Sequence, residues 1–89
     1  MSNTPKTVTV YSKTNCRQCD ATKRWLRQRE VTFSEVDLLA DEKNLEAAKS
    51  LGYQEAPVVV VGFGAPGDEQ HWSGFNPNEL NKHFTKENI

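Results

Sequence analysis

Two cysteines separated by two residues are the most reactive feature of this 89-residue chain, and Cys16 and Cys19 are its only cysteines. The segment before them, 7–11, alternates polar and apolar residues with the period of a half-buried strand. The segment that follows runs to Glu30 without glycine or proline and has helical spacing of its apolar residues. The pair is therefore expected at the start of a helix, where two thiols can close a small disulfide across one turn.

The expected position of Cys16 just ahead of the helix favours its thiolate. The sulfur would lie beside unpaired backbone N–H groups and the positive end of the helix dipole. Because the thiolate is the species that attacks a disulfide, Cys16 is predicted to be the nucleophile. Cys19, one turn into the helix and more covered, is predicted to resolve the mixed disulfide. This chemistry is dithiol–disulfide exchange, with the redox-active disulfide itself in place of a bound cofactor.

A zinc site is the competing interpretation of the pair. Such a site needs four ligands, and His71 and His83 are the only histidines available to complete it. Their spacing of twelve residues fits no usual zinc pattern, so no metal is expected. Both histidines are instead predicted to lie on the surface.

Three polar neighbours, Lys13, Arg17 and Gln18, are candidates for tuning the reactivity of the pair. A cation at Arg17 opposes the helix dipole, at a cost of about 0.3–1 kcal/mol, but it favours the thiolate of Cys16. The alternative is that the long side chain of Arg17 simply points into solvent. The same two interpretations apply to Lys13, which lies on the approach to Cys16.

The elements that would position these residues alternate between strand and helix. The first two strands should be parallel, with a right-handed crossover, and the last two should form an antiparallel hairpin. The order βαβαββα predicts a single α/β domain over residues 1–89, with a thioredoxin-like fold of three helices on a four-stranded mixed sheet. Strands are predicted over 7–11, 31–37, 58–61 and 69–72, and helices over 17–30, from the N-cap Asp41 to Gly52, and after the N-cap Asn76.

Pro57 precedes the β-branched run Val58–Val61, which should be buried on both faces of the sheet. An Ala-Pro bond alone is more often a trans turn, but with a dithiol upstream the cis form is predicted. In a thioredoxin-like fold such a proline lies beside the dithiol and stops that backbone from continuing the sheet. Ala56 would then be free to pair with an extended substrate peptide.

The segment His71–Phe75 places Trp72 and Phe75 on either side of Ser73 and Gly74, just before the last helix. An exposed indole at the end of the last strand, on the dithiol side, would be an anchor for a protein partner. For Phe75, membership of the core is the equal alternative. Trp72 to Phe75 are therefore candidate partner-binding residues, together with Ala56 and Pro57.

Composition excludes several classes of function. The 11 basic and 12 acidic residues give a net charge of −1 and no concentrated basic patch, which argues against nucleic-acid and anionic-membrane binding. The longest apolar run is too short to cross a bilayer, and residues 1–6 lack the apolar stretch of a secretory signal. A cytoplasmic protein is therefore expected, in which a cysteine pair is catalytic or metal-binding rather than structural.

Three motifs, at residues 16–23, 51–59 and 72–77, follow one another in a specific order. They read Cys-Arg-Gln-Cys-Asp-Ala-Thr-Lys, Leu-Gly-Tyr-Gln-Glu-Ala-Pro-Val-Val and Trp-Ser-Gly-Phe-Asn-Pro. The set resembles the NrdH-type redoxins, glutaredoxin-like proteins of the thioredoxin superfamily. The resemblance assigns Cys16 and Cys19 to the redox pair, Pro57 to the cis proline and Trp72–Phe75 to the C-terminal motif. The chain departs from the family at Arg17, where relatives usually have Val or Met, and at Asn76, where many have Arg.

The resemblance implies a small electron donor that acts between two proteins. Its disulfide would be reduced by thioredoxin reductase at the expense of NADPH, and its dithiol would re-reduce the large subunit of class Ib ribonucleotide reductase. A monomer is expected, because one exposed sulfur must be presented to both partners.

Two other functions use the same dithiol. A glutathione-dependent glutaredoxin commonly carries Thr-Val-Pro before the buried strand and a Gly-Gly-x-Asp-like turn later. Here these places read Glu55-Ala56-Pro57 and Trp72–Phe75, with a bulky indole and no aspartate. A non-enzymatic redox sensor or metal carrier would need further ligands or a regulatory domain, which this sequence does not supply.

Overall fold

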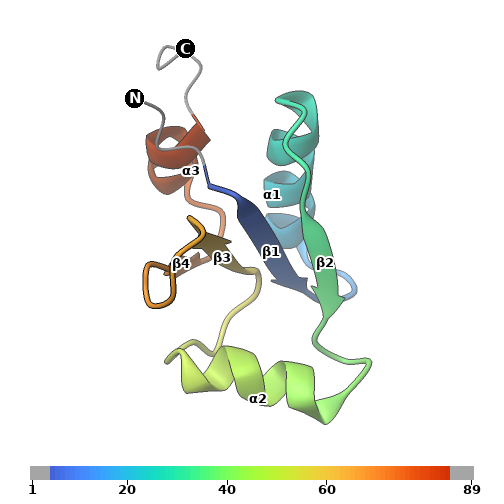
Figure 1. The fold of residues 1–89 in the computed structure, drawn as a ribbon. Helices are drawn as coiled ribbons and strands as arrows, with labels where there is room; N and C mark the ends of the chain where they lie inside the picture. The colour runs from blue at the N-terminus through green and yellow to red at the C-terminus, as the bar shows by residue number, and fades with distance from the viewer. Residues whose placement is uncertain (1–4, 85–89) are drawn as a thin grey trace.

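The computed structural model describes residues 5–84 and confirms the predicted βαβαββα order (Figure 1). The elements are β1 (Thr7–Ser12), α1 (Arg17–Gln28), β2 (Ser34–Asp37), α2 (Glu42–Ser50), β3 (Val58–Gly62), β4 (Gln70–Ser73) and α3 (Pro77–Phe84).

The four strands form one mixed sheet in the spatial order β2-β1-β3-β4. β1 runs parallel to β2 and antiparallel to β3, so that Tyr11 lies opposite both Val36 and Val58. β3 and β4 form the predicted antiparallel hairpin. Because the end of β1 is paired with the start of β3, the loop that carries Cys16 and the loop that carries Pro57 meet at the same end of the sheet.

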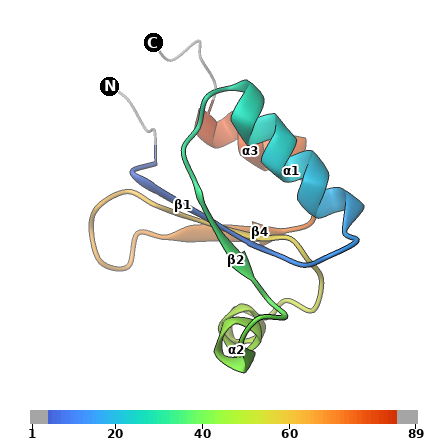
Figure 2. The same cartoon turned by 90° about the vertical axis from the view of Figure 1, so that its right-hand side faces the viewer.

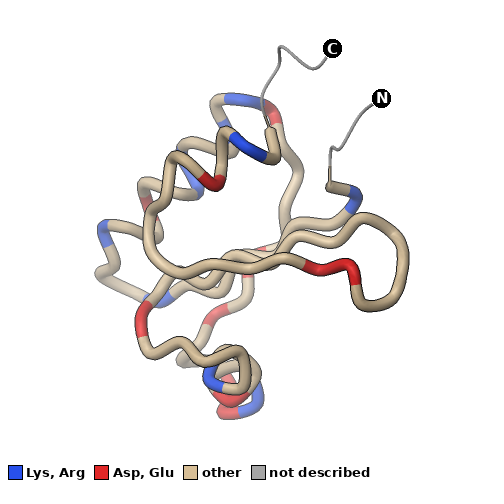
Figure 3. Tube along the Cα trace, turned by 90° about the vertical axis from the view of Figure 1, so that its left-hand side faces the viewer, with Lys and Arg blue, Asp and Glu red and all other residues tan. Residues whose placement is uncertain are grey.

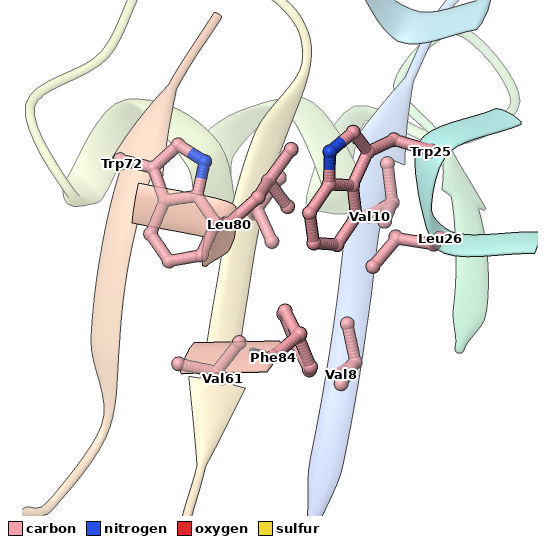
Figure 4. Packing of buried hydrophobic residues seen from close by; sticks show 9 residues of the cluster. Val8, Val10, Trp25, Leu26, Val61, Trp72, Leu80 and Phe84 are labelled. Atoms are coloured by element: carbon pink, nitrogen blue, oxygen red, sulfur yellow. The ribbon is translucent and has the colours of Figure 1, made fainter. Parts of the chain in front are cut away.

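Helices cover both faces of the sheet: α1 and α3 lie on one face and α2 on the other (Figure 2). This arrangement explains the run of valines in β3. Val59 and Val61 pack in the core under α1 and α3, whereas Val58 packs with the residues under α2. The larger core consists of Val8, Val10, Trp25, Leu26, Val59, Val61, Trp72, Leu80 and Phe84 (Figure 4).

Each helix begins at a residue that can cap it. Asp41 Oδ1 accepts the N–H of Lys43 at 2.9 Å, and Asn76 Oδ1 accepts the N–H of Glu79 at 3.2 Å. Both caps were predicted, and a proline follows Asn76 at the first position of α3. The cap of α1 is Cys16, which makes a catalytic candidate part of the helix terminus.

The second strand is shorter than predicted, because the end of α1 takes up residues expected to be extended. Glu30 adopts a left-handed conformation with φ of 59°. The N–H of Val31 then donates to the carbonyl of Leu26 at 2.9 Å and closes the helix end. Val31 and Phe33 pack against the larger core, and strand pairing begins only at Ser34. The fourth strand is displaced by one residue, to 70–73.

Charges of both signs are interspersed along the chain (Figure 3). α2 carries Glu42 and Glu46 beside Lys43 and Lys49. Among residues 5–84, no helix is long and apolar enough to cross a membrane.

Candidate active site

Cys16 and Cys19 form the predicted disulfide, with their Cα atoms 5.2 Å apart. Cys16 is the N-cap of α1, in an extended conformation, and its Sγ accepts the backbone N–H of Cys19 at 3.1 Å. This N–H is one of the donors that the first turn of a helix leaves without a backbone partner. It is positioned to stabilise negative charge on Cys16 Sγ when the disulfide is reduced, in the same direction as the helix dipole.

The two sulfur-bearing residues differ in exposure. Cys16 is 8% exposed, whereas Cys19 is 0% exposed. Cys16 also lines a surface hollow, whereas Cys19 does not, so Cys16 is the cysteine that a partner protein can approach. This asymmetry supports the predicted roles of Cys16 as the attacking sulfur and Cys19 as the resolving one.

A surface hollow of about 290 Å³ adjoins Cys16. It brings together four of the predicted site residues, which lie far apart in the sequence: Lys13, Arg17 and Gln18 before and within α1, and Ala56 before β3. Two further lining residues, Gln54 and Glu55, were not predicted to be functional. The signal that points to them is their position directly before Ala56-Pro57.

The Ala56–Pro57 peptide bond is cis, as predicted. The Pro57 carbonyl accepts the N–H of Gly74 at 2.8 Å, which ties the start of β3 to the turn after β4. Strand pairing in β3 begins at Val58. In the loops and turns of the described chain, no backbone hydrogen bond involves Ala56. Pairing of Ala56 with an extended peptide at Cys16 stays a prediction.

The expectation of an exposed indole at Trp72 is wrong. Trp72 is 6% exposed, and its side chain points into the larger core (Figure 4). The cause is strand alternation: in β4 His71 faces outward, so the next residue faces α3, where the indole stacks on His83 at 5.5 Å between ring centroids. The exposed aromatic residue of the motif is Phe75, which is 36% exposed. Partner binding by Trp72–Phe75 remains a prediction, now centred on Phe75.

Of the two histidines, only His71 lies on the surface as predicted, where its Nδ1 is 2.8 Å from the Tyr53 hydroxyl. His83 is 7% exposed and lies among the rings of Phe63, Trp72 and Phe84. Leu80 and Phe84 are buried on the inner face of α3, as its amphipathic pattern indicates, but this pattern gives no reason to bury the adjacent imidazole. Among residues 5–84, no group of three or more His, Cys, Asp or Glu could hold a metal ion.

Acidification is expected to destabilise the fold through His83. Burial of the imidazole lowers the pKa of His83 below its ordinary value of 6.5, an effect opposed by Glu79 and aided by Lys82. As the pH falls below 6.5, the unfolded chain takes up the proton before the folded chain does. The free energy of unfolding therefore decreases as the pH falls from that value towards the folded-state pKa.

Urea denaturation between about pH 7.5 and 5.5 measures this effect of His83. Over that range, the free energy of unfolding of His83→Gln is expected to depend less steeply on pH than that of the wild type. If the free energy of unfolding of wild type and His83→Gln depends equally on pH, the effect does not come from His83.

Ser73, Gly74 and Phe75 form a turn that is attached to α1 by Gln18. The Gln18 side-chain oxygen Oε1 accepts the N–H of Phe75 at 2.9 Å. Gly74 is buried with φ of 78°, and a Cβ at this position would lie 2.9 Å from the same oxygen. A residue other than glycine would thus both strain the backbone and displace the Gln18 side chain.

A polar cluster links the end of β1 and the middle of α1 to β2. Glu35 Oε2 accepts from the Ser12 hydroxyl at 2.8 Å and from Lys23 Nζ at 2.7 Å. The hydrogen bonds from Lys23 and Ser12 lower the pKa of Glu35. The carboxylate therefore stays ionised and links the end of β1 to α1, the two elements between which Cys16 lies.

Arg17 is exposed and lines the hollow beside Cys16, as it must if it is to act on the thiolate. The change Arg17→Val is expected to reduce the fraction of Cys16 that is ionised at neutral pH by a few-fold, because one nearby positive charge is lost. Ultraviolet titration of the reduced protein measures the thiolate. Arg24→Val, seven residues further along the same helix and also exposed, is the matched control. Equal titrations of the two variants would show that Arg17 is merely solvated.

Comparison with known proteins agrees with this geometry. The family model described as glutaredoxin matches residues 8–63. The glutaredoxin-like protein NrdH of Lactococcus lactis subsp. cremoris is 39% identical over 75 residues, which cover 84% of this chain and 96% of the relative. The glutaredoxin-like protein NrdH of Escherichia coli K12 is 32% identical over 75 residues, covering 84% and 85% of the two chains.

Solved structures give the same result. The NrdH-redoxin of Escherichia coli, a glutaredoxin-like protein described as having a thioredoxin-like activity profile, superposes with a TM-score of 0.71 at 33% identity. The match covers 84% of this chain and 91% of that one. The glutaredoxin of Archaeoglobus fulgidus, at 24% identity and a TM-score of 0.67, supports the fold alone. The chain therefore belongs to the glutaredoxin family and, within it, to the NrdH-type glutaredoxin-like thiol–disulfide oxidoreductases of thioredoxin-like fold.

Proposed function

We propose that this protein is a cytoplasmic, monomeric electron donor to class Ib ribonucleotide reductase, and that NADPH-dependent thioredoxin reductase keeps it reduced. The naming of its relatives supports the first partner. The thioredoxin-like activity profile ascribed to the Escherichia coli NrdH-redoxin supports a thioredoxin-type reductant. A reducing compartment suits a cysteine pair that must cycle between dithiol and disulfide.

The exchange requires only the two cysteines of this chain and a target disulfide. The Cys16 thiolate attacks one target sulfur, and the other target sulfur leaves as a thiolate. Cys19 then loses its proton to water and attacks Cys16 Sγ, which releases the second target thiolate and re-forms the Cys16–Cys19 disulfide. Two electrons have passed to the target, and reduction by the partner enzyme reverses the change in the redoxin.

The observation that favours a protein reductant over glutathione is the closed turn at Gly74–Phe75. A small anionic peptide such as glutathione needs free N–H donors for its carboxylate groups. Here the Gly74 N–H already donates to Pro57, and the Phe75 N–H already donates to Gln18. Glu55 adds a negative charge to the hollow beside Cys16. Glutathione would have to displace an internal hydrogen bond or bind without it.

The surface beside Cys16 suits a folded protein partner. A second hollow, of about 570 Å³, shares Lys13, Gln54, Glu55 and Ala56 with the hollow at Cys16. It continues over apolar residues that include Leu38, Leu45 and the 67% exposed Leu39. A hollow with both apolar and polar residues, joined to the one at the reactive sulfur, suits a protein–protein contact.

A coupled assay of NADPH oxidation tests the proposal. The full chain is supplied with thioredoxin reductase and the large subunit of class Ib ribonucleotide reductase, or with glutathione and glutathione reductase in place of the first enzyme. We expect turnover with thioredoxin reductase to exceed turnover with glutathione by at least about a hundredfold. Efficient turnover with glutathione would instead identify a glutathione-dependent glutaredoxin.

A further inference from the structure

Gln18 occupies an unusual position, because it lies between the two cysteines yet makes its side-chain contact with the far end of the chain. Its Oε1 accepts the N–H of Phe75 at 2.9 Å, across 57 residues of sequence. The same oxygen lies over the Cα of Gly74, close enough that a Cβ there would be 2.9 Å away. The residue also lines the hollow at Cys16. Gln18 thus borders both the hollow at the reactive sulfur and the turn after β4.

Without the Gln18 side chain, this turn would offer a place for an anion. The Gly74 N–H is held by the Pro57 carbonyl, so the Phe75 N–H is the donor that would become free. The hollow at Cys16, which Gln18 also lines, contains the cations of Lys13 and Arg17. A short peptide with a carboxylate at each end could then lie across Cys16.

We infer that Gln18 is the residue that excludes glutathione from this redoxin. Its neutral oxygen satisfies the Phe75 N–H and fills the space above Gly74, so that a carboxylate finds neither a donor nor room at the turn. This inference rests on the proposed function, in which a protein and not glutathione reduces the disulfide. Gln18 is a specificity-determining residue and takes no part in bond formation.

The reaction that Gln18 suppresses is stepwise reduction by two glutathione molecules. A glutathione thiolate attacks Cys16 Sγ, and Cys19 leaves as a thiolate and takes up a proton from water. A second glutathione thiolate attacks the sulfur of the bound glutathione, which releases the Cys16 thiolate and oxidised glutathione. Two glutathione molecules supply the two electrons. Both steps need the tripeptide held with its sulfur at Cys16, which the Gln18 side chain prevents.

The test compares Gln18→Ala with wild type and with the matched control Gln28→Ala, an exposed glutamine in the last turn of the same helix. Glutathione-dependent reduction of the Cys16–Cys19 disulfide is expected to be about tenfold faster in Gln18→Ala, the gain typical of one charge-assisted hydrogen bond. Gln28→Ala should behave as wild type. Gln18→Glu, which keeps the acceptor and adds a negative charge, should remain at or below the wild-type rate.

Two readouts independent of turnover accompany the kinetics. Hydrogen exchange of the Phe75 amide should accelerate in Gln18→Ala and not in Gln28→Ala. The unreactive probe S-methylglutathione should shift the Phe75 amide resonance of oxidised Gln18→Ala at concentrations that leave wild type unchanged. The inference is overturned if exchange of the Phe75 amide accelerates in Gln18→Ala but neither binding of the probe nor the glutathione-dependent rate increases. It is also overturned if exchange of this amide does not accelerate. High wild-type activity with glutathione would refute the proposed function itself, whatever the variants do.

Discussion

Replacing Cys16 by serine is expected to lower the rate of disulfide reduction at least about a thousandfold, because the chain loses its only accessible sulfur nucleophile. A serine hydroxyl stays protonated at neutral pH and cannot form a disulfide with a target. The remaining sulfur, that of Cys19, is completely buried and does not replace it. Reduction of insulin disulfides by the pre-reduced protein measures the loss.

Cys19→Ser is expected to fail at a different step and so tests the order of events. Cys16 is still present and its Sγ is still close to the backbone N–H of residue 19, so the first attack proceeds. The mixed disulfide then has no internal thiol to resolve it and accumulates.

A chromogenic aryl disulfide distinguishes the two variants. Reduced wild type should release two equivalents of aryl thiol, and Cys19→Ser one equivalent, with the second retained on Cys16 and visible by mass spectrometry. Cys16→Ser should react slowly, at the rate of a buried thiol. Rapid reaction of Cys16→Ser, or two equivalents released by Cys19→Ser, would reverse the assigned roles of the sulfurs.

The sequence predicts a feature of this structure correctly where residues close together in the chain determine it. The disulfide follows from two thiols one helical turn apart, and the caps at Asp41 and Asn76 follow from side chains that reach N–H groups two or three residues away. The parallel pairing of the first two strands and the antiparallel hairpin of the last two follow from the lengths of their connections. Predicting the cis bond before Pro57 required two separate sequence patterns, the cysteine pair and the run of valines. Each of these patterns can be recognised from neighbouring residues alone.

The parts that local patterns missed depend on contacts between distant segments. The side chain of Gln18 gives no sign in the sequence that it will meet Phe75. Trp72 was placed outside because four residues of an edge strand do not show which face is inward. Likewise, the end of α1 uses Glu30 in the left-handed conformation, where a glycine would have marked the boundary. For Gln18 and Trp72, the contacts that decide the position of the side chain are made with another helix or turn. For the end of α1, the glycine that usually marks such a boundary is absent.

Leu26→Ala is expected to destabilise the protein by about 2–5 kcal/mol, the range for a fully buried leucine that leaves a cavity. Leu26 is 0% exposed in α1 and packs in the larger core with residues of β1, β3, β4 and α3. For a domain of this size, such a loss would lower the melting temperature by about 10 °C or more. Because Leu26 lies on the helix that begins at Cys16, the same packing holds the redox pair against the sheet.

Denaturant unfolding of the oxidised protein measures the free energy, and Leu39→Ala is the matched control. Leu39 is the same residue type but 67% exposed outside any helix or strand, so its truncation should change stability by no more than about 0.5 kcal/mol. Should Leu26→Ala fail to fold, Leu26→Met, which nearly preserves volume, should fold and lose less than about 1.5 kcal/mol. A similar small loss in Leu26→Ala and Leu39→Ala would mean that α1 is not held by this core. The fixed position of Cys16 would then need another explanation.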